Sequence, residues 1–171
     1  VLPGQGAMRD SMRELRDSGM LPVVLEAAAS KPLFGVCVGM QMLLEHSAEG
    51  DGLQGTACLG LLPGRVVKFD LAGQHQPDGS RYKVPQMGWN ELLVNHDPLG
   101  LTLGLNHPIT AYFANSYYAL PSDRSIIFTE TDYGVRFASA IQTQTVLGCQ
   151  FHPEKSGQVG LHLLREFLKK H

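Results

Sequence analysis

The feature that most constrains the fold of this chain is a short apolar strand that runs directly into a glycine-flanked cysteine. Residues 32–44 read PLFGVCVGMQMLL, with a glycine two residues before Cys37 and another two residues after it. The run before the cysteine predicts a strand over 33–36, and the unbroken apolar run after it predicts a helix from residue 38 to about residue 46. Glycines on both sides remove side chains that would collide in so tight a turn. The stretch therefore predicts a strand-to-helix elbow with a nucleophile at its tip.

The position of Cys37 also favours its reactive form. A thiol at the start of a helix faces the positive end of the helix dipole, which stabilises the thiolate. The alternative is a small buried hydrophobic side chain, which is the role that we expect for Cys58 and Cys149. Three cysteines without a C-x-x-C pair argue against a disulfide framework or a zinc cluster, and they favour a reducing, cytoplasmic setting.

The segments around the elbow indicate the fold class. Apolar residues recur at helical spacing from Met8 to about Gly19, and a second helix is expected over 22–29, before the elbow strand. Helix, strand, elbow and helix in succession indicate an α/β domain with a doubly wound, mostly parallel central sheet and helices on both faces. Reactive groups in such sheets gather at the carboxyl ends of the strands, which is where Cys37 lies.

The second half of the chain is rich in short strands. Segments with strand periodicity occur at 64–69, 89–94, 111–116, 125–131, 136–142 and 145–151. The polar segment 70–83 is typical of a hairpin excursion, and residues 156–171 predict an amphipathic helix that Ser156 can cap. We therefore expect a mixed or antiparallel β-rich part that completes a single domain over residues 1–171.

A second reactive pattern follows the strand expected at 145–151. Pro153 disfavours the helical region for His152, so His152 stays extended. Residues two apart in an extended segment project to the same side, so Glu154 can accept the imidazole N–H of His152 and fix its tautomer. With Cys37 at another strand end, this is the layout of a nucleophile–base–orienter triad. A merely structural histidine is the alternative, but the conjunction of the two motifs is rare by chance.

Three other features have ordinary interpretations when the residues are taken alone. The turn at 3–6 reads as a strand–helix loop, Glu49 as a solvated acid in a loop over 47–52, and Trp89 as a core side chain. The formal net charge of −2 gives no sign of nucleic-acid binding. No apolar run approaches the roughly 20 residues of a membrane span, and the remaining histidines show no metal-ligand spacing. No metal or organic cofactor is therefore expected.

The motifs resemble a known family. G-V-C-V-G-M-Q at 35–41 and F-H-P-E at 151–154 resemble the class I glutamine amidotransferases. Within that family, P-Q-M-G-W-N at 85–90, Y-F-A-N-S-Y at 112–117 and H-P-E-K-S-G at 152–157 are similar to the glutaminase subunits of imidazole glycerol phosphate synthases of histidine biosynthesis. The resemblance covers nearly the whole chain. The triad motif fits any member of the family, and the M-G-W-N segment makes the assignment specific.

The resemblance implies hydrolysis of glutamine by Cys37, with His152 as the general base and Glu154 as its orienter. It implies oxyanion donors on the backbone of Gly4, Gln5, Gly6 and Val38, which changes the interpretation of the turn at 3–6. It also implies substrate contacts from Gln41, Glu49, Ser116 and Tyr117, with Glu49 holding the ammonium group of glutamine. Asn115 replaces a histidine that is common in the family, so any role of a protonated ring at that position is lost.

The resemblance further implies a heterodimer with a (β/α)₈-barrel synthase subunit, which receives the ammonia. The implied contact residues are Pro85, Met87, Trp89, Tyr112 and Lys155. The glutaminase is expected to be weak until that partner binds its ligand, because the oxyanion donors are incompletely arranged beforehand. Family members open with further strand–helix structure, so we expect an N-terminal strand–helix part to be missing from this chain.

Three alternatives remain from the residues. The same chemistry serves other amidotransferases, such as the anthranilate or aminodeoxychorismate type. The same triad serves a thiol hydrolase of esters or peptides, because it suits any acyl transfer. A catalytically silent interaction subunit is the third, and the presence of all three triad residues argues against it.

Overall fold

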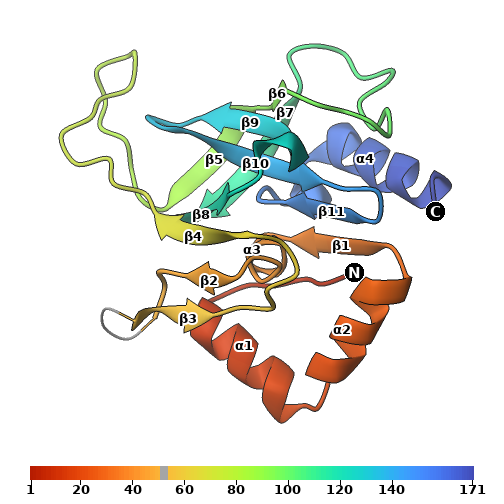
Figure 1. Ribbon diagram of the computed structural model, residues 1–171. Coiled ribbons are helices and arrows are strands. Elements are labelled where there is room, and N and C mark those ends of the chain that lie inside the picture. Colours follow the sequence, from red (N-terminus) through yellow and green to blue (C-terminus); the bar gives the residue numbers. More distant parts are fainter. Residues whose placement is uncertain (51–53) are drawn as a thin grey trace.

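The computed structural model describes residues 1–50 and 54–171 (Figure 1). Helices α1 (Met8–Asp17) and α2 (Leu21–Ser30) precede β1 (Leu33–Val36), which leads into the one-turn helix α3 (Val38–Gln41). The elements that follow are β2 (His46–Ser47), β3 (Thr56–Ala57), β4 (Gly64–Lys68), β5 (Gln86–Glu91), β6 (Leu93–Val94), β7 (Thr110–Asn115), β8 (Tyr117–Pro121), the 3₁₀ helix η2 (Arg124–Ile126), β9 (Ile127–Asp132), β10 (Arg136–Gln142), β11 (Val146–Cys149), the 3₁₀ helix η3 (Pro153–Lys155) and α4 (Gly157–Lys169).

Most strands belong to one mixed sheet in the order β1-β11-β10-β8-β4-β2-β3, with β9 paired to β10 and β6 paired to β9. Among the named strands of the described residues, only β1–β11 and β2–β4 run parallel. The expectation of a mostly parallel, doubly wound sheet is therefore wrong for this part of the chain. The connections give the reason, because residues 133–135 join β9 to β10 and residues 143–145 join β10 to β11. Links this short allow antiparallel pairs but not the crossover that a parallel pair needs.

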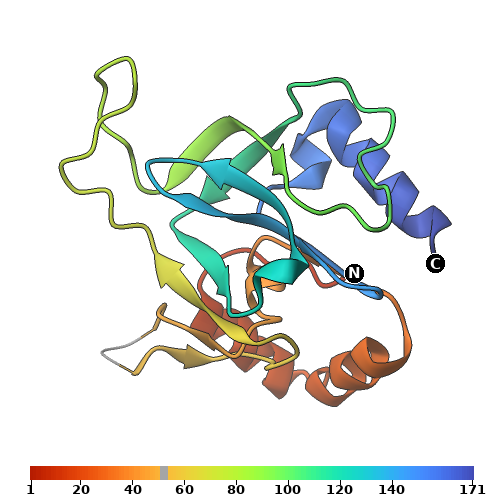
Figure 2. The ribbon, with the colours of Figure 1, turned by 45° about the horizontal axis from the view of Figure 1, so that its top comes forward.

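Each face of the main sheet has its own hydrophobic core. Leu33 of β1 packs on the face that carries Met8 and Met12 of α1, while its neighbour Phe34 packs on the face covered by Leu163 of α4. Successive residues of a strand point to opposite faces, so both faces need an apolar cover. Figures 1 and 2 show α1 and α2 on one side of the sheet and α4 on the other. Helices on both faces are as predicted.

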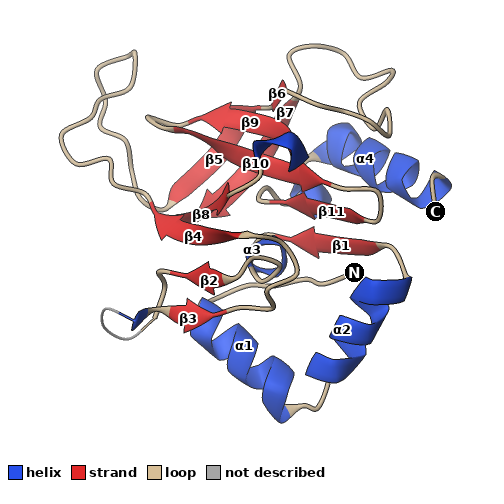
Figure 3. Ribbon diagram, viewed as in Figure 1, coloured by secondary structure: helices blue, strands red, loops and turns tan. Residues whose placement is uncertain are grey.

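The segment expected as one strand over 89–94 forms two strands in different sheets (Figure 3). β5 pairs with β7 in a separate two-stranded sheet, whereas β6 pairs with β9 in the main sheet. β8 is absent from the predicted strands. It follows β7 after the single residue Ser116 and pairs with β4 and β10 of the main sheet. Only Ser116 separates these strands, and no glycine or proline marks the junction, so the sequence pattern does not reveal that the chain changes sheet.

The helix predicted from residue 38 to about residue 46 is wrong in length, because α3 ends at Gln41. The N–H groups of Leu43 and Leu44 bond three residues back, as in a tightening last turn. The carbonyl groups of residues 42–44 then accept N–H groups from residues 59–62 rather than from a further helical turn. The loop expected over 47–52 begins instead as β2, and its residues 51 and 52 lie outside the described residues.

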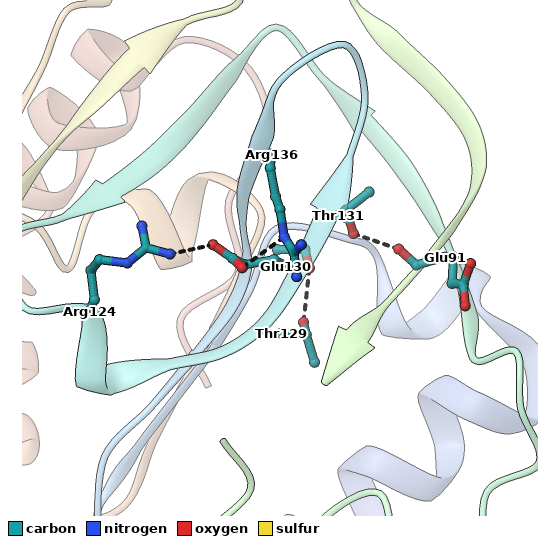
Figure 4. Close-up of polar contacts among 7 residues, drawn as sticks. Glu91, Arg124, Thr129, Glu130, Thr131 and Arg136 are labelled. Atoms are coloured by element: carbon teal, nitrogen blue, oxygen red, sulfur yellow. Dashed lines mark hydrogen bonds and ion pairs between the residues drawn. The ribbon is translucent and has the colours of Figure 1, made fainter. Parts of the chain in front are cut away.

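A buried carboxylate ties β9 to β10 and η2 (Figure 4). Glu130 accepts hydrogen bonds from Arg124 Nη2 and Arg136 Nε, each at 2.9 Å, and only 6% of its side chain is exposed. Burial raises the pKa of Glu130, but hydrogen bonds from Asn95 and Arg124 and the charges of the two arginines outweigh it. The pKa of Glu130 therefore lies below its ordinary value.

Candidate active site

The elbow at the end of β1 carries Cys37 in a strained conformation. Its φ is +53° and its ψ is −113°, and it is the only residue other than glycine with a positive φ in the described part of the chain. A Cβ on Gly35 would lie 2.9 Å from the backbone of Met40, and one on Gly39 would collide with the carbonyl of Leu2. The predicted elbow and the need for its two glycines are confirmed.

The parallel pairing of β1 with β11 brings the two reactive motifs together. Val36 lies opposite Cys149, and the N–H of Cys37 donates to the carbonyl of Cys149 at 2.7 Å. The chain leaves β11 through Gln150 and reaches His152 within three residues of the strand end. Since the carboxyl ends of parallel strands meet at one edge, Cys37 and His152 line the same pocket.

The histidine and the carboxylate are paired as predicted. His152 Nδ1 lies 2.7 Å from Glu154 Oε1, and the backbone of His152 is extended (φ −95°, ψ 101°). Glu154 itself lies in η3, so the expectation that both residues share one extended segment is wrong. The tight turn after Pro153 brings the carboxylate back to the ring. If Nδ1 donates to this carboxylate, Nε2 is the nitrogen free to accept a proton.

Ser156 anchors this loop rather than capping α4. Its Oγ donates to the carbonyl of His152 at 2.7 Å and accepts the N–H of Tyr112 at 3.0 Å. It makes no side-chain cap bond to α4, so the capping prediction is wrong, although α4 itself covers most of the predicted segment. The N–H of His152 also donates to the carbonyl of Tyr112 at 2.9 Å. These bonds fix the histidine loop against β7.

The pocket has a volume of about 310 Å³. Of the residues proposed from the sequence, it is lined by Cys37, His152, Gln5, Gly6, Val38, Gln41, Glu49, Ser116, Tyr117, Pro85 and Lys155, together with Ala114 and Asn115. Gly4, Glu154, Met87, Trp89 and Tyr112 do not line it. The triad, the turn at 3–6 and the implied substrate contacts therefore meet at one site, although they come from distant parts of the sequence.

The turn at 3–6 packs tightly against the elbow. A Cβ on Gly4 would lie 2.7 Å from the N atom of Gly39 and 2.8 Å from the Cβ of Val38, so only glycine fits there. Gly6 has a φ of +87°, which a residue with a side chain rarely adopts. Gln5 and Gly6 line the pocket. Gly4 does not line it, but its lack of a side chain lets the turn pack directly against Val38 and Gly39 of the elbow. The turn is thus a built part of the site rather than an ordinary loop.

The thiol of Cys37 is protonated in this arrangement. Burial raises its pKa to about 11; the charges of Glu154 and Glu49 act in the same direction, and hydrogen bonds from the Val38 backbone and the Gln150 side chain oppose them. The backbone N–H of Val38 at the start of α3 lowers the pKa of Cys37, as its position at a helix start predicts, but burial outweighs this effect and the thiol form is favoured. Cys37 therefore needs a base in order to react.

Of the two other cysteines, Cys149 is buried as predicted, whereas Cys58 is only half-buried. Burial raises the pKa of the Cys58 thiol to about 11, and Cys149 is fully buried with a raised pKa. All three cysteines are free.

Gln41 is buried, and both N–H groups of its amide can be satisfied within the protein. Its Nε2 lies 3.0 Å from the carbonyl of Tyr117 and 2.8 Å from Oε1 of Gln150. The Nε2 atom of Gln150 lies 3.7 Å from Cys37 Sγ. Sequence reasoning missed Gln150, although its position two residues before His152 at a strand end was the available signal.

Glu49 has a defined partner, so a merely solvated loop acid is the wrong interpretation. Its Oε2 accepts the N–H of Met8, the first residue of α1, at 2.8 Å. The negative charge of Glu49 also adds to burial in raising the pKa of Tyr117. A carboxylate on the pocket wall attracts a cationic group.

Asn115 has an incomplete set of hydrogen bonds. Its Nδ2 donates to the carbonyl of Tyr117 at 3.0 Å, while its buried Oδ1 has no partner among the described residues. The amide thus braces the β7–β8 junction at the pocket wall. It takes the place of the histidine that the family resemblance led us to expect.

Three of the residues expected at a partner interface, Met87, Trp89 and Tyr112, lie on β5 and β7, and two of them form an exposed apolar patch. Met87 is 66% exposed and Trp89 is 56% exposed, so a core tryptophan is the wrong interpretation. The Trp89 ring lies edge-on to Tyr112, and Lys155 Nζ lies 5.9 Å from the centre of the Tyr112 ring. A hollow of about 960 Å³, lined by Trp89, Met87 and Arg81, continues this face toward the excursion at 70–83.

Other classes of site were sought in the same residues. Across residues 1–50 and 54–171, no three His, Cys, Asp or Glu side chains group in a way that would hold a metal ion. The helices of that part are all too short or too polar to span a membrane.

Comparisons with known proteins identify the family of this chain. The family model Glutamine amidotransferase class-I matches residues 2–171, so the chain belongs to the class-I glutamine amidotransferase family. The resemblance drawn from the motifs is thereby confirmed.

Three relatives make the likeness more particular. Proteins named imidazole glycerol phosphate synthase subunit HisH are 48% identical to it in Aromatoleum aromaticum, 45% in Chromobacterium violaceum and 44% in Dechloromonas aromatica. These matches cover 98%, 98% and 99% of this chain and 77%, 76% and 76% of the respective relatives. A crystal structure of a glutamine amidotransferase has the same fold, with a TM-score of 0.64 at 20% identity, over 98% of this chain and 76% of that one.

Proposed function

We propose that this protein is the glutaminase subunit of an imidazole glycerol phosphate synthase and hydrolyses glutamine through Cys37, His152 and Glu154. The observation that carries the proposal is that Cys37 and the His152–Glu154 pair follow neighbouring parallel strands and flank one pocket. The identity of 43–48% to relatives named as that subunit supports it. We further propose that residues 1–171 form a single domain and that the protein is cytoplasmic, in keeping with its three free cysteines.

The acylation step uses the free nitrogen of His152. Cys37 Sγ attacks the side-chain amide carbon of glutamine as His152 takes the thiol proton, and the amide oxygen becomes an oxyanion. Backbone N–H groups of Val38, Gln5 and Gly6, which line the pocket, stabilise that oxyanion, and Gly4 holds the turn against the elbow. The C–N bond then breaks as His152 gives its proton to the leaving nitrogen. The products of this step are ammonia and a γ-glutamyl thioester.

The second step returns the enzyme to its starting state. His152 takes a proton from a water molecule, which attacks the thioester carbon. The C–S bond breaks, glutamate leaves, and the proton on His152 restores the thiol of Cys37. Glu154 holds the imidazole in place and supports its positive charge in both steps. No metal or organic cofactor enters this scheme.

The polar wall of the pocket fits an amino acid better than an ester or a peptide. Glu49 supplies a negative charge for the α-ammonium group of glutamine. Both N–H groups of Gln41 point to protein acceptors, so its oxygen is the atom that remains for a ligand N–H. Ser116 and Tyr117 line the pocket from the β7–β8 junction and position the rest of the substrate.

We propose that a (β/α)₈-barrel synthase subunit binds the exposed face of β5 and β7 and receives the ammonia. Met87, Trp89 and Tyr112 form the centre of that face, and Pro85 and Lys155 lie both on the pocket and beside the face. The shared residues support a short path from the pocket to the partner. The barrel subunit would use the ammonia to make imidazole glycerol phosphate and aminoimidazole carboxamide ribotide.

The test is glutamate formation from glutamine, with and without the barrel subunit and its nucleotide ligand. We expect slow hydrolysis alone and strong stimulation by the liganded partner, and no turnover by Cys37→Ala. A folded protein that is not stimulated would disprove the histidine-pathway assignment and favour another amidotransferase. Turnover by Cys37→Ala would remove Cys37 from the mechanism. Hydrolysis of a thiol-protease ester substrate without glutamine hydrolysis would favour a thiol hydrolase.

A further inference from the structure

We propose that Gln150 is a positioning residue for the nucleophile: its side-chain N–H holds and stabilises the sulfur of Cys37, and Gln41 fixes the orientation of the Gln150 amide. The proposal rests on the proposed function, because it gives Gln150 a part in activating that thiol. Gln150 is fully buried and does not line the pocket, so it acts through Cys37 rather than through contact with a ligand.

The geometry is a chain of hydrogen bonds behind the pocket wall. Gln150 Nε2 lies 3.7 Å from Cys37 Sγ, a distance typical of an N–H bond to the larger sulfur atom. Gln41 Nε2 lies 2.8 Å from Gln150 Oε1 and 3.0 Å from the carbonyl of Tyr117. The backbone N–H of Gln150 donates to the carbonyl of Ser139 on β10 at 2.9 Å, which anchors the residue to the sheet.

The order of donors and acceptors in this chain allows only one orientation of the Gln150 amide. The carbonyl of Tyr117 is an acceptor, so Gln41 must place its NH₂ group there and toward Gln150. Gln150 must therefore place its oxygen toward Gln41, and its NH₂ group faces Cys37. The reversed amide would set two N–H donors against each other in a buried site and leave both unsatisfied.

This donor acts on the charged form of the sulfur. A hydrogen bond to a thiolate stabilises it, whereas burial and the negative charges of Glu154 and Glu49 oppose ionisation. His152, Tyr117 and Lys155 are the other titratable groups on the same pocket. The amide of Gln150 does not titrate, so its contribution is present at every pH. It also limits rotation of the thiol, which keeps the sulfur in the position from which it reacts.

The test is the rate at which iodoacetamide alkylates Cys37 in the complete chain between pH 7 and pH 9, followed by mass spectrometry of the Cys37 peptide. Gln150→Met removes the donor at similar length. We expect alkylation about three- to tenfold slower at every pH, because the thiolate fraction falls about tenfold while the more basic thiolate reacts faster. Gln150→Glu still accepts from Gln41 but turns a negative charge toward the sulfur, so it slows alkylation at least as much.

In glutamine hydrolysis both variants lower kcat and change KM by less than about twofold.

Gln142→Met is the matched control. Gln142 is buried on β10, and neither amide atom has a hydrogen-bond partner among the described residues, so its loss leaves the alkylation rate unchanged. Wild-type alkylation rates in folded Gln150→Met and Gln150→Glu would overturn the proposal, and Gln150→Glu decides alone if Gln150→Met does not fold. Glutamine hydrolysis by Cys37→Ala would overturn the proposed function instead, while the alkylation rates would still decide the role of Gln150.

Discussion

The nitrogen atoms of His152 are divided between two tasks, and this division sets the chemistry at the scale of single residues. Nδ1 is held 2.7 Å from Glu154, and Nε2 is left for proton transfer. Cys37 is protonated at neutral pH because burial raises its pKa to about 11, so it depends on that transfer. The carboxylate of Glu154 affects both His152 and Cys37. It orients the imidazole of His152, and its negative charge raises the pKa of Cys37.

Removing the charge of Glu154 should have opposite effects on two measurements. In Glu154→Gln the amide oxygen still accepts from Nδ1, but the imidazolium loses its counter-charge, so we expect kcat for glutamine to fall about 100-fold. The charge of Glu154 raises the pKa of Cys37, so its removal should lower that pKa and make alkylation of Cys37 no slower than in the wild type. Steady-state kinetics and iodoacetamide labelling check the two effects. Equal falls in both rates would mean that the variant disturbs the fold rather than the charge.

The sequence was sufficient to predict the elbow at Cys37 and the His152–Glu154 pair, but not the environment of the thiol. G-x-C-x-G and H-P-E are local patterns with a steric or hydrogen-bonding cause, so they can be interpreted without a structure. The pKa of Cys37 depends on burial and on Glu49 and Glu154, which no local pattern contains. Gln150 was missed for the same reason. Its proposed role depends on contacts with Cys37 and Gln41, which lie 113 and 109 positions earlier in the chain.

At the scale of elements, each failed prediction has a tertiary cause. α3 stops at Gln41 because the carbonyls of residues 42–44 bond to residues 59–62. The strand expected over 89–94 divides because β5 and β6 belong to different sheets. The strand over 136–142 was predicted with its observed bounds. Strand periodicity therefore located several of the longer strands but missed β8, and pairing partners and sheet membership needed the folded chain.

The ion pairs of Glu130 predict how the stability of this part of the sheet depends on pH. The folded pKa of Glu130 is lowered, so its contribution is complete above the ordinary glutamate pKa of about 4.3 and is lost as the pH falls through the folded pKa. We expect Glu130→Gln to lower the free energy of unfolding at pH 7 by about 1–2 kcal/mol, a modest loss because Arg124 and Arg136 are exposed. The difference from the wild type should shrink below about pH 4.

Urea denaturation at pH 7 and at pH 3.5 measures this difference. Glu91→Gln is the control, because Glu91 is exposed on β5 and only its backbone carbonyl is used, by Thr131. It should change the free energy of unfolding by less than about 0.5 kcal/mol. A loss for Glu130→Gln that is as large at pH 3.5 as at pH 7 would show that packing, rather than charge, is at work.

At the scale of the whole molecule, the site is assembled from segments that are distant in sequence. The turn at 3–6, the elbow, the loop at Glu49, the β7–β8 junction and the segment after β11 all reach one pocket. The exposed β5–β7 face lies beside it. Met87 and Trp89 are exposed two residues apart on β5, and an exposed apolar patch of this kind supports the proposal that a second subunit binds there.

Trp89→Ala should weaken binding of the barrel subunit by at least about tenfold, because exposed aromatic anchors supply much of the affinity of an interface. The dissociation constant measured by calorimetry checks this. Leu103→Ala is the control: Leu103 is 74% exposed in the loop between β6 and β7, outside the β5–β7 face. An unchanged dissociation constant for Trp89→Ala, or an equal loss for Leu103→Ala, would argue against this face as the interface.

If Glu49 binds the ammonium group of glutamine as proposed, its bond to Met8 links ligand binding thermodynamically to the first turn of α1. The carboxylate that accepts the Met8 N–H also lines the pocket, so a bound ammonium group competes with the helix for the same oxygen atoms. We expect glutamine to speed hydrogen exchange of the Met8 amide, measured by NMR in Cys37→Ala, and to leave exchange in α4 unchanged. Linkage is reciprocal, so a partner that loosens α1 would tighten glutamine binding by the same factor. If glutamine does not change the hydrogen exchange of the Met8 amide, Glu49 can bind the ammonium group and the Met8 N–H at the same time.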